Sequence, residues 1–394
     1  MAETYVEINL SALSHNARVL TEKYNDYDYL IGVVKADAYG HGYEAAKALH
    51  RGGVGYFAVS SMEEAARFRE VLPDVPLLML QPIELERLNE AYEMKLTLAI
   101  GDREYLHRFI VLSKNYYFKV HLQVDTGFNR LGFKDRSELG AAFDALTAAG
   151  HTVEGVYQHF ATAGIFDPHF DEQVRRFSEL VSALDLKKIE MVHMGSGVSL
   201  LGHEKIPLAN CARMGMVMYG YNVSPSSYGG GLKNRLRTLR DRYFQKKYRL
   251  SPIIRDVELD LIPAMTLKSR VIALKKVRKG EYVGYDCLYR ADEDITVAVL
   301  PVGYNNGIGQ KNLGRMVEIG GRLYPVIGAV GMNMSIVKVD ETVKVYDEAI
   351  LLGGRITLGM FSRSADMTLA EALLSVGKNN ERIYIDSEGE KIWR

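Results

Sequence analysis

Reactive side chains follow several of the short apolar segments in the first half of this 394-residue chain. Lys35 comes directly after one such segment, in the stretch Val33-Val34-Lys35. A lysine that emerges from a buried strand loses solvation, and its pKa falls from about 10.4 toward neutrality. An unprotonated amine can then form an imine with a carbonyl group. We therefore predict that Lys35 is a nucleophile; the alternative is a strand-end lysine that merely extends into solvent.

Groups suited to an anionic, planar ligand follow later apolar segments. Ser196, with glycines on both sides, and Gly215 can present a hydroxyl and backbone N–H groups to a phosphate. Arg213 offers donors in a fixed plane and never accepts a hydrogen bond. Histidines also follow these segments, at His121, His159 and His193. One histidine in such a place is usually a core residue, but reactive groups after four consecutive segments are harder to dismiss. A lysine, a phosphate cradle and a planar donor together indicate pyridoxal phosphate.

The elements that must position these side chains alternate between two kinds. Eight apolar runs rich in β-branched and aromatic residues are typical of buried strands, at residues 29–34, 56–59, 77–80, 96–100, 118–124, 153–158, 189–194 and 213–218. Helical patterns lie between most of them, for example at 62–71, 84–93, 137–149 and 170–184. This alternation predicts a closed (β/α)8 barrel, whose active site forms at the C-terminal strand ends. A doubly wound open sheet is the alternative, but eight sequential units favour closure.

The pattern changes after about residue 225, and we predict three segments. Residues 1–225 form the cofactor-binding barrel, 226–258 a basic linker, and 259–394 a C-terminal, mostly-β domain with alternating runs at 267–273, 295–300, 316–319 and 329–339. In the linker, residues 233–249 hold eight Lys/Arg and one acid, Asp241. A solvated surface helix or loop is the favoured interpretation, and a docking site for an acidic partner is the alternative.

Composition narrows the class of protein. The chain has 49 Lys/Arg and 49 Asp/Glu, and this balance gives no basis for a nucleic-acid or acidic-membrane partner. A hydrophobic fraction of 47% with 25% charged residues is ordinary for a globular protein. Neither Cys211 nor Cys287 belongs to a CxxC motif, so no disulfide scaffold or metal site is expected. No signal peptide or membrane-spanning run is visible, and we predict a cytoplasmic protein.

Sequence motifs along nearly the whole chain resemble those of the alanine racemase family. The most specific is VKADAYGHG at Val34–Gly42, and the others are VDTGxxRLG at Val124–Gly132, HFATA at His159–Ala163, RxGxxMYG at Arg213–Gly220, Gly284-Tyr285, and Val302-Gly303-Tyr304. This family is fold type III among pyridoxal phosphate enzymes. Its fold, a (β/α)8 barrel followed by a β domain, agrees with the pattern described above.

The resemblance implies a pyridoxal phosphate-dependent isomerase that interconverts L- and D-alanine, or a related small or polar amino acid, for cell-wall biosynthesis. It implies that Lys35 forms the imine with the cofactor and is the base for the D-face proton. Tyr285 would serve the L face, reaching in from the partner subunit of a head-to-tail homodimer. An amino acid is thus the small-molecule partner, with no nucleic acid and no membrane.

The same resemblance assigns the other site residues. Cofactor-binding residues would be Tyr39, His159, Ser196, Arg213, Gly215 and Met216, and substrate-binding residues would be Arg130, Tyr304 and Met332. Tyr39, Ser196, Gly215 and Met216 would hold the phosphate, and His159 would stack at the ring. Arg213 would face the pyridine nitrogen and keep the ring uncharged, because an arginine cannot give up its proton.

Several positions depart from the family pattern together. Gln123 replaces a lysine, and Gly164, Asn306, Gln310, Ala329, Gly331 and Asn333 replace residues that are mostly charged in the family. A neutral amide at Gln123 can still hydrogen-bond Arg130. The family's C-terminal tyrosine segment is also missing, and residues 373–382 read LLSVGKNNER. We therefore expect an ion-paired substrate entrance to have been lost as a unit, and the pocket to be larger or more polar.

Other functions remain open at this stage. A fold-related decarboxylase of basic amino acids also uses a barrel lysine and a β domain, although its glycine-rich phosphate motif and catalytic cysteine segment are not seen here. A pyridoxal phosphate-binding protein without racemase activity would lack the second domain. An inactive regulator is disfavoured because Lys35 and Tyr285 are both retained.

Overall fold

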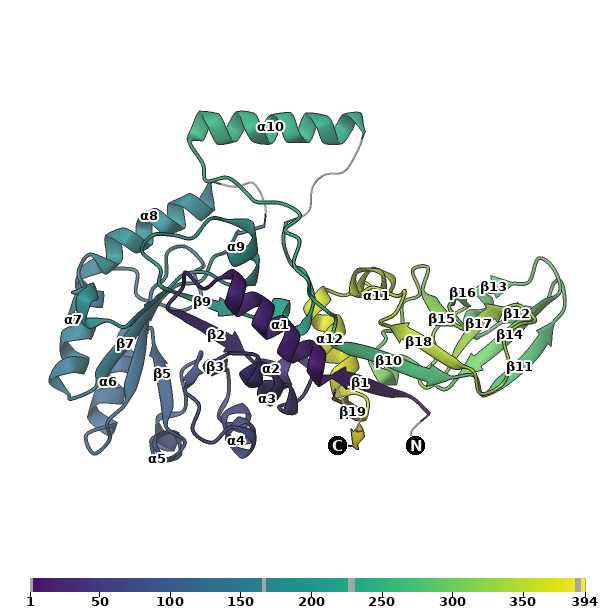
Figure 1. Cartoon of the computed structure of the whole chain (residues 1–394), viewed down its shortest axis with the longest axis horizontal. Helices are drawn as coiled ribbons and strands as arrows, with labels where there is room; N and C mark the ends of the chain where they lie inside the picture. Colours follow the sequence, from purple (N-terminus) through teal and green to yellow (C-terminus); the bar gives the residue numbers. More distant parts are fainter. Residues whose placement is uncertain (1–2, 165–167, 226–230, 387–390, 394) are drawn as a thin grey trace.

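The first half of the chain forms a closed barrel of eight parallel strands (Figure 1). The computed structural model describes residues 3–164, 168–225, 231–386 and 391–393. The barrel strands are β2 (Tyr29–Val33), β3 (Tyr56–Val59), β4 (Leu77–Met79), β5 (Leu96–Ile100), β6 (Lys119–Gln123), β7 (Thr152–Tyr157), β8 (Met191–His193) and β9 (Cys211–Met214). They pair in sequence order, and β9 closes on β2. The predicted barrel is confirmed, and the open-sheet alternative is wrong.

Helices cover the outside of the barrel, as its apolar outer strand faces require. They are α1 (Leu10–Lys23), α3 (Glu44–Arg51), α4 (Met62–Val71), α5 (Leu88–Glu93), α6 (Arg103–Leu112), α7 (Arg136–Ala148), α8 (His169–Val181) and α9 (Gly197–Gly202). Several begin at an Asp or Ser cap; in α4, for example, Ser61 accepts a hydrogen bond from the amide of Glu64 at 3.2 Å.

The eighth strand differs from its predicted position. The apolar pattern predicted residues 213–218, whereas β9 covers Cys211–Met214 and a 3₁₀ turn, η3, covers Met216–Tyr219. Gly215, at φ −112° and ψ −117°, breaks the strand between them. A continuous apolar run does not distinguish a buried strand from a buried helix, because either element is apolar on all sides when it is fully buried.

The second domain is built on a ten-stranded sheet and a two-stranded ribbon, β12–β13. The order in the large sheet is β11-β14-β17-β16-β15-β18-β10-β1-β19-β20. Its members are β1 (Tyr5–Asn9), β10 (Met265–Arg270), β11 (Ala273–Val277), β14 (Ile295–Leu300), β15 (Met316–Ile319), β16 (Arg322–Ile327), β17 (Ser335–Val339), β18 (Glu348–Leu352), β19 (Arg382–Ile385) and β20 (Lys391–Trp393), and the ribbon is β12 (Tyr282–Val283) with β13 (Tyr289–Arg290). The mostly-β prediction is confirmed.

Two segments of this domain depart from the prediction. The N-terminal strand β1 lies in the second sheet, between β10 and β19, although residues 1–225 were assigned to the barrel. Only long-range pairing places it there, so its local sequence carries no sign of it. The predicted strand at 329–339 is a strand only from Ser335, because residues 328–334 form a turn that begins at Gly328 with φ +67°. The exact domain boundaries stay a prediction.

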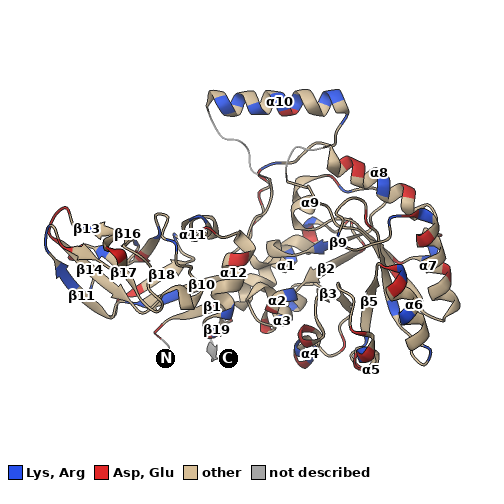
Figure 2. Cartoon of the chain, turned by 180° about the vertical axis from the view of Figure 1, so that it is seen from behind, with Lys and Arg blue, Asp and Glu red and all other residues tan. Residues whose placement is uncertain are grey.

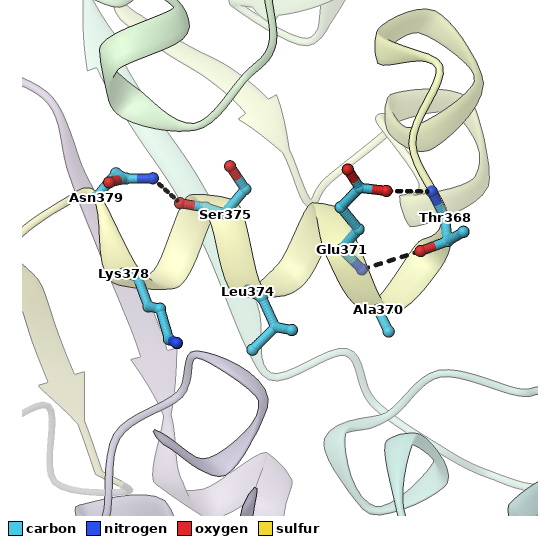
Figure 3. Close-up of a pocket in the computed structure, with 7 residues that line it drawn as sticks. All are labelled: Thr368, Ala370, Glu371, Leu374, Ser375, Lys378 and Asn379. Atoms are coloured by element: carbon cyan, nitrogen blue, oxygen red, sulfur yellow. Dashed lines mark hydrogen bonds between the residues drawn. The ribbon is translucent and has the colours of Figure 1, made fainter. Parts of the chain in front are cut away.

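Helix α12 (Leu369–Lys378), which follows α11 (Leu358–Ala365), joins the second domain to the mouth of the barrel. A capping box fixes its start: the Thr368 amide donates to Glu371, and the Glu371 amide donates to the Thr368 hydroxyl, both at 3.2 Å (Figure 3). At the other end of the helix, the backbone of Gly377 lies against the backbone of Gly40. A Cβ added at Gly377 would lie 2.1 Å from the Gly40 carbonyl oxygen. The helix therefore packs directly on the loop that follows Lys35.

The basic linker contains one long helix, α10 (Leu232–Tyr248), which stands apart from both domains (Figure 1). Its return segment is tied to the barrel, because the Ser251 amide donates to Asp171 of α8 at 3.0 Å. In the ranges that the structure describes, no helix is long and apolar enough to cross a membrane.

Candidate active site

A cavity of about 470 Å³ opens at the C-terminal ends of the barrel strands. Eight of the predicted site residues line it: Lys35, Tyr39, Arg130, His159, Ser196, Arg213, Gly215 and Met216. Gln123 also lines it, and α12 of the second domain contributes Ala370. The residues come from separate strand ends and loops, so closure of the barrel is what brings them together.

Lys35 is held by an uncommon backbone turn. The four residues that follow it, 36–39, all have left-handed φ values between +52° and +58°, and none of them is glycine. The left-handed conformation costs roughly 1–2 kcal/mol for each such residue, so its surroundings must stabilise it. The first amide of the turn donates to Glu64 at 2.5 Å. Asp37 pairs with Arg382, which belongs to β19 of the second domain.

The amine of Lys35 is set up to be a base or nucleophile. Partial burial lowers its pKa, the cations Arg130 and Arg213 lower it further, and only Glu64 opposes them. Each effect disfavours the charged ammonium form. Lys35 is therefore partly buried at this strand end, as the sequence predicted.

Arg213 lies buried on the floor of the cavity, with all its observed hydrogen bonds made by its two terminal nitrogens. Nη1 donates to His193 Nδ1 at 2.8 Å and to its carbonyl oxygen at 3.2 Å. Nη2 donates to the carbonyl of Gln158 at 2.8 Å and to His159 Nδ1 at 3.3 Å. Among the described residues Nε has no such partner, so one N–H donor is left for a ligand. Burial lowers the pKa of Arg213, but a guanidinium stays protonated at physiological pH.

A chain of hydrogen bonds continues from Arg213 into the barrel interior. His193 Nε2 contacts His121 Nδ1 at 2.8 Å, and His121 Nε2 contacts Glu154 at 3.1 Å. Because arginine only donates, His193 must accept at Nδ1 and donate from Nε2. The same logic makes His121 accept at Nδ1 and donate from Nε2 to the carboxylate. Both rings are then neutral, as burial, which lowers both histidine pKa values, also favours.

Glu154 ends this chain because the sheet is irregular there. Val120 pairs with Val153, but the next residue, His121, pairs with Gly155, so Glu154 is an extra residue in β7. Such a bulge redirects a side chain, here into the barrel. A Cβ at Gly155 would lie 2.6 Å from the His121 ring, so glycine is needed beside it.

Donors surround the Glu154 carboxylate. Tyr56 donates to it at 2.7 Å and Lys119 at 2.5 Å. Burial alone would raise its pKa, but the hydrogen bonds that His121, Lys119 and Tyr56 donate outweigh this and lower the pKa to about 2. Sequence reasoning noted His121 and His193 without giving them a role, and missed Glu154. The available signal was an acid followed by glycine inside an apolar strand, Val-Glu-Gly-Val-Tyr.

The opposite end of the cavity carries backbone donors. Ser196 caps α9, and Gly215 precedes η3, so the first amides of both turns lie at this end. A Cβ added at Gly215 would come within 3.1 Å of the Tyr39 hydroxyl. An anion site requires hydrogen-bond donors such as amides at helix starts and hydroxyl groups. It also requires a glycine that lets the ligand come close to the backbone.

Three predicted residues lie outside this cavity, on the second domain. Tyr285 is 70% exposed, Met332 56% and Tyr304 38%. The backbone nevertheless brings them together: the Tyr304 amide donates to the carbonyl of Gly331 at 3.0 Å. A Cβ at Gly331 would lie 3.8 Å from the Tyr285 ring. They form one exposed cluster, separate from the barrel site of their own chain.

Comparisons with known proteins decide the family. Residues 8–223 match the family "Alanine racemase, N-terminal domain", and residues 264–384 match "Alanine racemase, C-terminal domain". An alanine racemase of Streptococcus pneumoniae serotype 19F (strain G54) is 30% identical over 349 residues, which is 88% of this chain and 87% of that one. The chain belongs to the alanine racemase family.

Solved structures of alanine racemases agree. The enzyme of Clostridium difficile 630 has a TM-score of 0.84 at 26% identity, covering 100% of this chain and 98% of its own. The Bacillus anthracis enzyme, solved with bound L-Ala-P, has a TM-score of 0.82 at 26% identity, covering 100% and 97%. The chain is thus an isomerase of a family that uses pyridoxal phosphate, and its cavity corresponds to the predicted cofactor site of an alanine racemase-type fold.

The positions that depart from the family pattern have found other contacts. Gln123 accepts a hydrogen bond from the Tyr157 hydroxyl at 3.0 Å, and within the described ranges none joins it to Arg130. The structure therefore shows Gln123 bonded to Tyr157, and a hydrogen bond between Gln123 and Arg130 stays a prediction. Asn306 exchanges hydrogen bonds with Asn380 beyond α12, at 2.9 Å each. Uncharged amides thus link η5 (Tyr304–Asn306) to the end of that helix.

Replacing Glu154 by Gln tests the buried chain. The folded pKa of about 2 lies below the ordinary value of 4.5, so the carboxylate stabilises the fold above pH 4.5, and this contribution is lost as pH falls toward 2. At pH 7 we expect the variant to be less stable to urea by roughly 3 kcal/mol. The difference from wild type should shrink between pH 4.5 and 2. A surface control, Glu22→Gln, should show no difference; a gap for Glu154→Gln that is absent or independent of pH contradicts the assignment.

Proposed function

We propose that this chain is a pyridoxal phosphate-dependent amino-acid racemase that interconverts the enantiomers of alanine or a related small or polar amino acid. The observation that supports this most is one cavity holding an amine of lowered pKa, Lys35, and a buried donor-only group, Arg213. These are the groups that an aldehyde cofactor with a basic ring nitrogen needs at its two ends.

The residues present fit that cofactor. Lys35 would bind its aldehyde carbon, and the Nε–H of Arg213 would donate to the ring nitrogen. Tyr39, Ser196 and the backbone at Gly215 and Met216 would hold its phosphate. His159 stays neutral beside the ring, because burial and then the nearby arginines lower its pKa to about 3. When bound, pyridoxal phosphate supplies an electron sink that weakens the α C–H bond of the amino acid.

Racemisation requires a proton to leave one face of the α-carbon and another to arrive on the opposite face. Lys35 Nζ would act on the D face, and the Tyr285 hydroxyl on the L face. Arg130, which is exposed and whose guanidinium lies 4.4 Å from the Phe128 ring centroid, would bind the substrate carboxylate. Tyr304 and Met332 would complete the substrate entrance beside Tyr285.

The second base must come from another subunit. Tyr285 does not line the cavity of its own chain and is 70% exposed. Other large apolar side chains around it are exposed as well: Tyr282, Leu288, Met332 and Met334. Exposed apolar surface of this kind marks an interface. A head-to-tail homodimer would cover it and deliver Tyr285 to the neighbouring barrel.

Three features support a substrate broader than alanine. The α12 side chain that lines the cavity is only a methyl group, Ala370. Gln123 adds an uncharged polar group to the same wall. The second-domain turn carries Ala329 and Asn333 where the family has an arginine and an aspartate, so the entrance formed in the dimer would lack an ion pair. The preference would therefore include polar amino acids such as serine.

Proton exchange at the α-carbon tests the proposed activity. The purified protein should be yellow, borohydride should bleach it, and Lys35→Ala should remove the colour. In deuterated buffer, L-alanine or L-serine should gain α-deuterium and invert. The matched control Lys47→Ala, at a lysine on the outer helix α3, should behave as wild type. Release of carbon dioxide, or colour without exchange for any of the twenty amino acids, would reject the racemase.

Mixing two inactive variants tests where Tyr285 acts. A Lys35→Ala subunit keeps Tyr285, and a Tyr285→Phe subunit keeps Lys35. In a hybrid dimer, one of the two sites then holds both bases if Tyr285 serves the neighbour. We expect a one-to-one mixture, refolded or coexpressed, to recover roughly a quarter of wild-type activity. No recovery, in a sample whose hybrid dimers are verified by mass, would place Tyr285 in its own chain's site or outside catalysis.

Substitution at the α12 wall tests the pocket. Ala370→Tyr adds a ring to the cavity and should reject side chains larger than methyl. We expect the ratio of kcat/KM for serine over alanine to fall about tenfold or more. Leu374→Tyr, one turn further along the same helix, is the matched control. An unchanged ratio in Ala370→Tyr, with activity on alanine retained, would show that α12 does not limit the pocket.

A further inference from the structure

Helix α10 (Leu232–Tyr248) takes no part in the site described above, and it is the outermost element on its side of the molecule (Figure 1). Two chain segments connect it to the barrel and to β10. At 1.5 Å per residue its 17 residues extend over about 25 Å. A helix at this distance from the core presents a long surface to solvent.

The face turned away from the protein is apolar. Leu232, Leu236, Leu239 and Tyr243 recur at spacings of four, three and four residues, which places them on one side of a helix. Leu232 is 77% exposed, and the other three are 59% exposed. A helix that is merely solvated would place polar residues here. The expected surface helix is therefore present, but its outward face is apolar rather than polar.

Basic side chains border this apolar stripe on both sides. Arg235, Arg242 and Lys246 lie along one border, and Lys233, Arg240 and Lys247 along the other. The helix has seven Lys/Arg in all and one acid, Asp241 (Figure 2). Long basic side chains at such borders can keep their charges in a polar layer while the apolar stripe is buried.

The single acid lies on the opposite face and is already neutralised. Asp241 is buried, and it pairs with Arg240 at 2.8 Å and with Arg255 of the return segment at 3.6 Å. At 100° per residue, Leu232 and Tyr243 point almost directly away from it. The body of the protein therefore fixes the rotation of the helix, and the apolar, positively bordered side faces outward.

We propose that α10 is a membrane-surface helix that binds anionic lipid bilayers, with its apolar stripe in the interface and its basic borders against the headgroups. An apolar face bordered by Lys and Arg is the pattern of helices that lie in the plane of a membrane. The charge of α10 disfavours packing against α10 of a second copy. A purely nucleic-acid surface would not need four exposed apolar side chains in line.

Vesicle binding by the full-length holoenzyme tests this. We expect it to sediment with vesicles of phosphatidylcholine and phosphatidylglycerol at about 2:1, and not with phosphatidylcholine alone. Raising the salt to about 1 M should release it, since the Debye length falls to about 3 Å. Arg242→Gln with Lys246→Gln should weaken binding about 25-fold, and Leu236→Ser with Leu239→Ser about tenfold or more.

Matched controls separate α10 from general surface effects. Lys114→Gln with Lys187→Gln removes two exposed charges elsewhere, and Leu112→Ser removes an exposed leucine of α6; both should bind as wild type. Racemase activity and dimer mass should be unchanged in the α10 variants. Equal binding to neutral vesicles, no binding to anionic vesicles, tighter binding to duplex DNA, or loss of the dimer in α10 variants would each overturn the proposal.

Discussion

The buried charge of Arg213 is the constraint on which the rest of the barrel interior depends. An uncompensated ion in a protein interior costs several kcal/mol. The groups around the guanidinium must therefore be hydrogen-bond acceptors, and they must lie within hydrogen-bonding distance of it. Because a guanidinium only donates, each histidine in the chain must accept on one side and donate on the other, until Glu154 ends the series as a pure acceptor. The bulge in β7 and the glycine at 155 serve that arrangement, since the first redirects Glu154 and the second leaves room for the His121 ring. The chemistry at the cavity floor is thus fixed by residues that do not line the cavity themselves.

A second constraint joins the two domains. The left-handed turn after Lys35 is unfavourable by itself, and part of what holds it comes from far along the chain: Arg382 pairs with Asp37, and α12 packs against Gly40 at Gly377. The N-terminal strand β1 also lies in the second sheet before the chain enters the barrel. The lysine is therefore positioned jointly by both domains. The same helix α12 brings Ala370 to the cavity. The contact between the two domains and the size of the pocket therefore depend on one helix.

Local patterns were sufficient to predict the barrel, because each buried strand is a separate apolar run between recognisable helices. They also pointed to Lys35, Ser196 and Arg213, which follow strand ends and line one cavity, whereas Tyr39, Arg130 and Met216 were expected only from the family resemblance. Long-range effects could not be predicted in this way. The position of β1 depends on strands more than 250 residues away, and the role of Glu154 depends on a register shift between neighbouring strands. The hydrogen bond that Gln123 accepts from Tyr157, on the adjacent strand, was likewise not predicted from the sequence. Tyr285, Tyr304 and Met332 do not line the cavity of their own chain, and under the proposed function their place in a site would depend on a second copy of the chain.

The protonation of His121 and His193 tests the central claim most directly, because the chain from Arg213 to Glu154 allows only one arrangement. Nitrogen-15 NMR of the holoenzyme, labelled at histidine and assigned with His121→Gln and His193→Gln variants, reports the state of each ring nitrogen. We predict that both rings are neutral at pH 7 and carry their proton on Nε2, because burial lowers both pKa values. A proton on Nδ1 of either ring, or a charged imidazolium at pH 7, would contradict the account.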